Sequence, residues 1–140
     1  MRAETLIERP LIDGLSLGRL LAEGGFAEIH HAHDGERRLA IKIARAHGDS
    51  HVQREAEVLT TLARRMGPEL GAIAGLVRDG VTADGRRFLA LELVGGESLA
   101  DVLTRQGARP PAAIVGPFGA LCRSITSIHR AGVIHRDIKP

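Results

Sequence analysis

The spacing of apolar positions changes partway along the chain and separates two regions. From about Leu15 to Leu93 the spacing is mostly that of strands, in which alternate residues share a face. Glycine-containing breaks divide this region into extended runs at residues 15–21, around 29, 39–43, 76–81 and 88–93. The runs predict a meander of three antiparallel strands and a further hairpin.

A helix is predicted between the third and fourth runs. Ser50 is followed three residues later by Gln53, which is the pattern of a capping box, and Gly67-Pro68 supplies the stop. The predicted core face repeats at helical spacing and consists of Val52, Ala56, Leu59, Leu62, Ala63 and Met66.

The second region is helical. Ser98 can cap a short helix over 99–106 that ends at Gly107. After Pro110-Pro111, apolar residues recur at alternating intervals of four and three, which predicts an amphipathic helix over 112–131, and we expect Pro117 in or near its first turn.

Composition and charge narrow the class of protein. With 140 residues, 44% of them apolar and 26% charged, the chain has the composition of one globular domain or a piece of one. The net charge of +2 comes from basic and acidic residues mixed along the chain, which disfavours a nucleic-acid partner. Cys122 is the only cysteine, so a reducing compartment, the cytoplasm, is expected. Acidic residues interrupt the place of a secretory signal, and no segment of these residues has the length of a membrane span.

Three features carry candidate chemistry: a glycine turn, a lysine–glutamate pair and a charged loop. The segment from Leu21 to Ile29 holds a glycine turn between two strands, where backbone N–H groups could approach phosphate oxygens, although an ordinary hairpin turn explains it equally well. Alternation places Lys42 among small side chains, opposite the apolar face of its strand. Glu55 lies inside the apolar stripe of the predicted helix, and because an unpaired buried charge is unfavourable, we expect an ion pair between Glu55 and Lys42.

The third feature is the charged loop that ends the chain. Asp137 offers a carboxylate that can accept a hydroxyl proton, and Lys139 offers an ammonium that can hold a phosphate. Val133 and Ile134 predict that the loop is tucked against a core. Histidines at 30, 31 and 33 lack further ligands at suitable spacing, so no metal site is predicted there.

The glycine turn, the Ala-Ile-Lys strand, the helix glutamate and the His-Arg-Asp loop occur in an order that resembles the eukaryotic-like serine/threonine protein kinases. The resemblance covers Leu15 to Pro140. It implies an α+β fold: a kinase small lobe made of a five-stranded antiparallel sheet plus one helix, followed by the first helices of a truncated helical large lobe. The implied domains are an N-terminal extension at 1–14, the small lobe and hinge at 15–94, and the start of the large lobe at 95–140.

The resemblance also implies roles for single residues. Lys42 would hold the α and β phosphates of ATP and pair with Glu55, Asp137 would be the catalytic base, and Lys139 would contact the γ phosphate. Glu92 and Val94 would bind adenine through hinge backbone groups. The implied gatekeeper is Leu91, the apolar roof over the base is Leu21, Ile29 and Ala40, the phosphate-facing glycine is Gly24, and the ribose contact is Ser98, for which helix capping is an equal explanation.

The sequence also departs from the family pattern. Only the middle glycine of the family loop is kept, as Gly24, with Ala22 and Ala27 at the flanking positions. The asparagine and the Asp-Phe-Gly motif that hold Mg²⁺ in the family would lie beyond Pro140. We therefore interpret the chain as a fragment that is inactive alone.

The resulting hypothesis is ATP-dependent phosphoryl transfer to serine or threonine hydroxyls of a protein substrate. A non-catalytic, kinase-like module that binds nucleotide or a partner is the alternative, and a small-molecule phosphotransferase of the same fold is a third. The protein substrate, the activating signal and the oligomeric state are left open.

Overall fold

The computed structural model describes residues 12–67 and 73–139. Most of the predicted N-terminal extension, residues 1–11, lies outside the described residues. Contacts divide the chain into two compact units, one made of Met1–Glu57 with Gly75–Leu93 and the other of Val58–Ala74 with Val94–Pro140.

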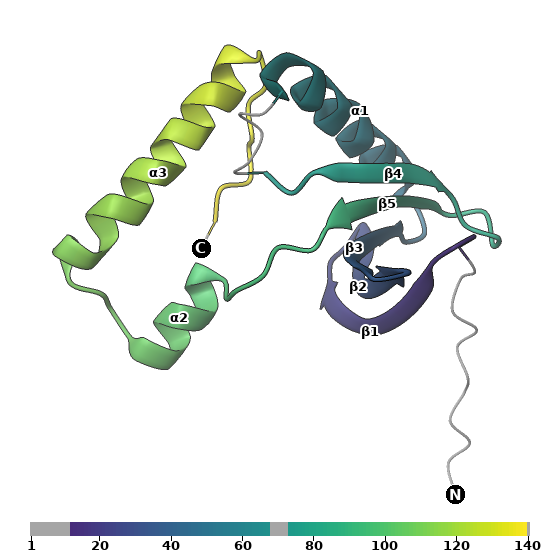
Figure 1. Ribbon diagram of the computed structural model, residues 1–140, viewed down its shortest axis with the longest axis horizontal. Helices are drawn as coiled ribbons and strands as arrows, with labels where there is room; N and C mark the ends of the chain where they lie inside the picture. Colours follow the sequence, from purple (N-terminus) through teal and green to yellow (C-terminus); the bar gives the residue numbers. More distant parts are fainter. Residues whose placement is uncertain (1–11, 68–72, 140) are drawn as a thin grey trace, which may run out of the picture. The chain divides into compact units, whose positions relative to one another are not determined.

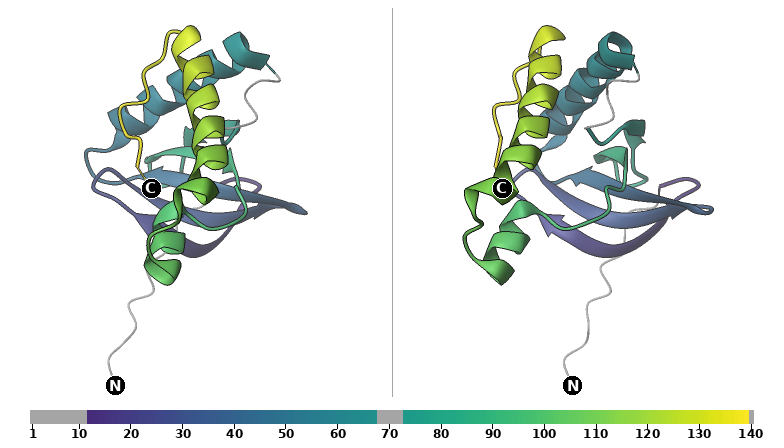
Figure 2. Two further views of the ribbon diagram at one scale, coloured as in Figure 1. Left: turned by 90° about the vertical axis from the view of Figure 1, so that its left-hand side faces the viewer. Right: turned by 60° about the vertical axis from the view of Figure 1, so that its left-hand side comes forward.

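The first unit holds a five-stranded sheet in the order β1-β2-β3-β5-β4, with every neighbouring pair antiparallel. This confirms the predicted meander and hairpin. Left-handed glycines, Gly35 at φ 59° and Gly85 at φ 86°, allow the tight turns after β2 and β4. Figure 2 shows the twist of the strands. The strands are β1 (Ser16–Glu23), β2 (Ala27–Asp34), β3 (Arg37–Ala44), β4 (Leu76–Val81) and β5 (Arg87–Glu92), labelled in Figure 1.

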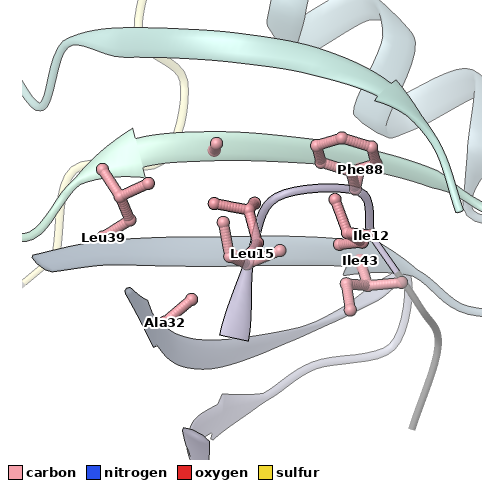
Figure 3. Close-up of a cluster of buried hydrophobic side chains, with 8 residues drawn as sticks. Ile12, Leu15, Ala32, Leu39, Ile43 and Phe88 are labelled. Atoms are coloured by element: carbon pink, nitrogen blue, oxygen red, sulfur yellow. The ribbon is translucent and has the colours of Figure 1, made fainter. Parts of the chain in front are cut away.

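One face of the sheet forms an apolar core. Leu39, Ile41 and Ile43 alternate along β3 and are fully buried. The segment before β1 folds back over this face, and Figure 3 shows Ile12 and Leu15 lying over β3 among these side chains. The packed part of the sheet therefore begins at Ile12, which is 3% exposed.

The opposite face is covered by the first half of α1 (Asp49–Met66). Val52 and Ala56 of the helix pack against Ala27, Ala44 and Leu89 of the sheet. From Leu39 to Ala44 no residue of β3 is exposed, because the strand is covered on both faces.

The predicted capping box at Ser50 is wrong. The helix begins at Asp49, and the N–H of Val52 donates to the carbonyl of Gly48 at 3.0 Å, so Ser50 lies inside the first turn. The side chain of Gln53 donates to Glu57 at 3.2 Å and takes no part in capping. Contacts of Gly48 with the glycine turn, described below, place the helix start earlier than the local signal predicts.

The second unit has its own core. It is built from Leu62 and Met66 in the second half of α1 and from Ile128 and Ala131 at the end of α3 (Pro111–Arg130). Nη1 of Arg65 donates to the carbonyl of Ala131 at 2.5 Å and ties the two segments together. Ala63, which the sequence placed on the core face, is exposed and does not belong to this cluster.

The short helix α2 (Leu99–Gln106) confirms its prediction, with Ser98 as N-cap and Gly107 as C-cap at φ 72°. The helix α3 begins with Pro111 in its first turn, and Pro117 lies in the second turn, near the first as predicted. The first half of the α3 stripe is open, with Phe118 60% exposed and Ile114 41% exposed. Within the described ranges, no helix has the length and apolar character needed to span a membrane.

Candidate functional site

Strand register gathers the predicted nucleotide-binding residues of the first unit on one face of the sheet. Ile29 of β2 pairs with Lys42 of β3, and Ala40 of β3 pairs with Leu91 of β5. Directly opposed residues share a face, so these four lie on the side of the sheet that α1 covers. Leu21 lies between two paired positions of β1 where the register shifts, and it is partly buried.

The predicted ion pair is present. Nζ of Lys42 lies 2.5 Å from Oε2 of Glu55, joining β3 to the first half of α1. The side chains are 26% and 35% exposed, so the pair is shielded on one side and open to solvent on the other. A shielded ammonium with a fixed orientation is suited to holding an anionic ligand at the open side.

The glycine turn between β1 and β2 is closed by a hydrogen bond from the N–H of Gly24 to the carbonyl of Ala27, at 2.9 Å. Neither Gly24 nor Gly25 has a left-handed backbone. A Cβ on Gly24 would meet only the Ala27 carbonyl, at 3.6 Å, and one on Gly25 would meet nothing within 4 Å. The glycines therefore contribute open space over the turn, and alanine at the flanking positions leaves that space in place.

Arg45 braces the same turn, although no sequence prediction included it. Its Nη1 donates to the carbonyl of Gly24 at 3.1 Å, and its Nη2 forms an ion pair with Glu23. Arg45 directly follows the last residue of β3. A cation at the end of a strand opposite a glycine turn is the only sequence signal for this contact, and it also fits an exposed surface residue.

The predicted hinge begins at the end of β5. The side chain of Glu92 accepts hydrogen bonds from Arg37 and from the N–H of Gly75, each at 3.3 Å. The N–H of Glu92 donates to the carbonyl of Gly75 at 2.9 Å. Since the side chain and the N–H of Glu92 already form hydrogen bonds, its backbone carbonyl is the group that it can offer to a ligand. Val94 belongs to the second unit and is 72% exposed.

The hydroxyl of Ser98 caps α2. It accepts from the N–H of Asp101 at 3.1 Å and donates to the Asp101 carboxylate at 2.6 Å. The sequence left two explanations for Ser98 open, a ribose contact and helix capping, and the structure contains the capping hydrogen bond.

The charged loop after α3 presents its functional groups to solvent. Nζ of Lys139 lies 3.0 Å from Oδ2 of Asp137, with the side chains 73% and 72% exposed. The N–H of Asp137 donates to Nδ1 of His135 at 3.2 Å. Arg136, between them, has a left-handed φ of 64°, which is unusual for a residue with a Cβ.

Only part of the loop is tucked in as predicted. Val133 packs against the core of the second unit, and its N–H donates to the carbonyl of Ile128 at 3.2 Å. Ile134 is 65% exposed, contrary to the prediction. Val133 therefore contributes to this core, and its neighbour Ile134 takes no part in that cluster. Across 12–67 and 73–139, no group of three or more His, Cys, Asp and Glu side chains is arranged to hold a metal ion.

A separate cluster of charges ties the β4–β5 hairpin to β2. Arg86 pairs with Glu28 at 3.0 Å and with Asp84 at 2.9 Å. Burial lowers the pKa of Arg86, but its hydrogen bonds with Glu28 and Asp84 raise it overall. The Thr82 hydroxyl, and beside it Arg86, lower the pKa of Asp84 below 3.8 against a smaller opposing effect of burial. The cluster stabilises the sheet that carries Lys42.

His31 pairs with Ala40 on the face that carries Lys42. Burial, and then the neighbouring charges of His33, Arg19 and Arg38, lower the pKa of His31 below 6.5. This shift favours the neutral form of the imidazole.

Comparison with known proteins identifies the arrangement. The protein kinase domain family matches residues 15–140. The chain is 31% identical over 144 residues to the serine/threonine-protein kinase PknL of Mycobacterium tuberculosis, covering 96% of the chain and 34% of that protein. It is 35% identical over 132 residues to the serine/threonine-protein kinase pkn2 of Myxococcus xanthus, covering 87% of the chain and 15% of that protein.

Among solved structures, the PknI kinase domain of Mycobacterium tuberculosis matches with a TM-score of 0.70 at 19% identity, covering 91% of this chain and 53% of that one. This likeness supports the predicted fold, a kinase small lobe followed by the first helices of the large lobe. The chain spans about a third or less of the curated relatives named here. Over residues 15–140 it belongs to the protein kinase family, of the eukaryotic-like type.

Proposed function

We propose that this chain supplies the ATP-binding face and the catalytic base of a kinase that transfers the γ phosphate of ATP to serine or threonine hydroxyls of proteins. The observation that carries the proposal is the Lys42–Glu55 pair on the side of the sheet where register gathers Ile29, Ala40 and Leu91. In this proposal residues 15–94 act as small lobe and hinge, and residues 95–140 begin the large lobe.

On the nucleotide side, the ammonium of Lys42 holds the α and β phosphates, and Glu55 keeps that ammonium in place. Leu21, Ile29 and Ala40 cover the adenine ring, Leu91 is the gatekeeper, and the backbone groups of the hinge bind the base edge. Gly24 gives the phosphates room because its neighbourhood is open. The hinge groups are the carbonyl of Glu92 and the backbone of Val94, and Ser98 is the ribose contact.

On the protein-substrate side, the carboxylate of Asp137 accepts the proton of the attacking hydroxyl, so that the oxygen can attack the γ phosphorus as the bond to the β phosphate breaks. Lys139 neutralises charge on the transferred group. The side chain of Asp137 is 72% exposed, so its carboxylate is accessible to a protein substrate.

The choice of lysine at these two positions supports the proposal. Lys42 and Lys139 are the only lysines in the sequence, although lysine and arginine together number 19. The chain otherwise uses arginine for its cations. The ammonium of lysine holds phosphate oxygens as a compact point charge, and the proposal places a phosphate contact at each of the two lysines.

Mg²⁺ accompanies ATP in this family and neutralises its phosphates. The described residues offer no ligand group for it, so none of them is assigned to the metal. The lone thiol of Cys122, free and exposed, favours the reducing cytoplasm as the place where this domain works.

The test uses the full-length gene product, with labelled phosphate transfer from ATP to itself and to a generic protein substrate. Lys42→Met and Asp137→Asn are each expected to lower the rate by at least about a hundredfold, because they remove the phosphate-holding cation and the base. The matched control is Arg54→Met, an exposed cation on the first half of α1. A thermal melt of each variant excludes misfolding as the cause.

Undiminished transfer by both variants would defeat the proposal. Nucleotide binding by the unaltered protein without any transfer would favour the non-catalytic module. Transfer to an aminoglycoside or choline, with none to protein, would favour the small-molecule phosphotransferase.

A further inference from the structure

Phe26, in the glycine turn, makes a contact that the proposed chemistry does not use. The side chain is 55% exposed, yet its ring stacks on the imidazole of His51 with the ring centroids 3.8 Å apart and the planes 23° apart. His51 lies in the first turn of α1. The stack therefore joins the glycine turn to the start of that helix, within the first unit.

The backbone of Phe26 is held at the same place. Its carbonyl accepts a hydrogen bond from the N–H of Arg45 at 2.9 Å. The carbonyl also lies 1.9 Å from the position that a Cβ on Gly48 would occupy, so any side chain at 48 would displace it. The N–H of Gly48 donates to the Arg45 carbonyl at 2.7 Å, which closes the segment between β3 and α1 around Phe26.

The side chain of Arg45 braces the other side of the turn. It donates to the carbonyl of Gly24 and pairs with Glu23, the last residue of β1. The turn is thus fixed on one side by Arg45 and on the other by the ring of His51.

The position of His51 links these contacts to the Lys42–Glu55 pair. His51 and Glu55 are four residues apart on α1, so they lie on the same helix face, one turn apart. A movement of the helix that withdraws Glu55 from Lys42 also withdraws His51 from Phe26. The turn and the ion pair are therefore coupled through one rigid element.

We propose that His51, through its stack on Phe26, and Arg45, through Gly24 and Glu23, are positioning residues that hold the glycine turn in the place it takes when Glu55 is paired with Lys42. This rests on the proposed function, since the turn is taken to cover bound ATP. A turn held in place before the nucleotide arrives loses less conformational entropy on binding, so the contacts raise the affinity for ATP. Loss of the stack is expected to weaken binding and not to strengthen it.

The experiment measures the dissociation constant for ATP by calorimetry on the full-length gene product. Phe26→Ala and His51→Ala are each expected to weaken binding by about two- to tenfold, the worth of one aromatic contact. The double variant is expected to be no weaker than either single one, because both remove the same stack. His51→Phe keeps a ring that can stack on Phe26 and is expected to keep the affinity of the unaltered protein. Arg45→Met is expected to weaken ATP binding. Arg54→Ala, at an exposed position of the same helix, is the matched control.

A second measurement needs no nucleotide. Hydrogen exchange of the amides at residues 24–27 is followed in the ATP-free protein, where His51→Ala is expected to speed exchange and His51→Phe to leave it unchanged. Additive losses in the double variant, tighter binding by His51→Ala, or unchanged exchange would overturn the proposal. If the unaltered protein binds no ATP, the proposed function fails, while the exchange result still decides whether His51 holds the turn.

Discussion

Replacing Glu55 with glutamine tests the ion pair on which the proposed site depends. Glutamine keeps the shape and the hydrogen-bonding oxygen but removes the charge that lies 2.5 Å from Nζ of Lys42. The ammonium then keeps a weaker acceptor and is free to turn toward solvent.

The size of the effect follows from the burial of the pair. Two unit charges in contact would interact by about 4 kcal/mol at the effective dielectric constant of a protein surface. Exposed pairs are measured at about 0–1 kcal/mol and buried pairs, when one partner is removed, at about 3–5 kcal/mol. With the side chains 26% and 35% exposed, this pair lies between those limits. We expect a loss of about 1–2 kcal/mol, which corresponds to about a five- to thirtyfold weaker affinity for ATP if all of it serves to position Lys42.

The assay is calorimetric titration of ATP into the full-length gene product, with urea unfolding of the same samples. Glu57→Gln is the matched control, because it makes the same chemical change at an exposed position of the same helix. Its effect on both quantities is expected within about 0.5 kcal/mol. Equal ATP affinities for Glu55→Gln and Glu57→Gln, with Glu55→Gln correctly folded, would refute the reasoning.

Three further predictions follow from single contacts. Asp137→Asn should lower kcat by about a hundredfold or more and leave the KM for ATP nearly unchanged, because a lost base affects the chemical step and not nucleotide binding; steady-state kinetics show the split, and a raised KM alone would contradict it. Ser98→Ala should lower the free energy of unfolding by about 1 kcal/mol through the lost cap, and an accompanying rise in the KM for ATP would show that the hydroxyl also meets the ribose. The pKa of Asp84 is lowered in the folded state, so its contribution to the free energy of unfolding is present above pH 3.8 and is lost as pH falls through the folded pKa. Asp84→Asn should therefore flatten the pH dependence of the free energy of urea unfolding in that acid range. An unchanged slope would count against a stabilising role of the Arg86 cluster.

The strands and helices were predictable because the apolar pattern and the burial agree. In β3 the alternation of Leu39, Ile41 and Ile43 matches one buried face, and Lys42 follows on the other. The cap of α2 at Ser98 was equally local, since one hydroxyl and the next N–H groups of the helix decide it. Such features depend on residues a few positions apart, which a single sequence displays directly.

The errors have non-local causes. Ser50 and Gln53 have the spacing of a capping box, but the start of α1 is set by Gly48, whose missing side chain makes room for the carbonyl of Phe26. Ile134 follows Val133 in the loop after α3, and only Val133 packs against the core of the second unit. In both cases packing against a distant segment outweighs the local signal.

The difference between Glu55 and His51 shows which site residues a sequence can reveal. Burying an unpaired carboxylate costs free energy, so the place of Glu55 inside an apolar stripe predicted a cationic partner. Lys42 on the preceding strand was the cation within reach. Phe26 and His51 are both exposed, and exposed residues carry no such penalty, so nothing in the sequence required them to meet. Their contact arises because the turn and the helix start are brought together by Arg45 and Gly48. The partner of a buried charge can thus be predicted from the sequence, because the charge would be unfavourable without it. A positioning contact between two exposed side chains is seen only in the folded structure.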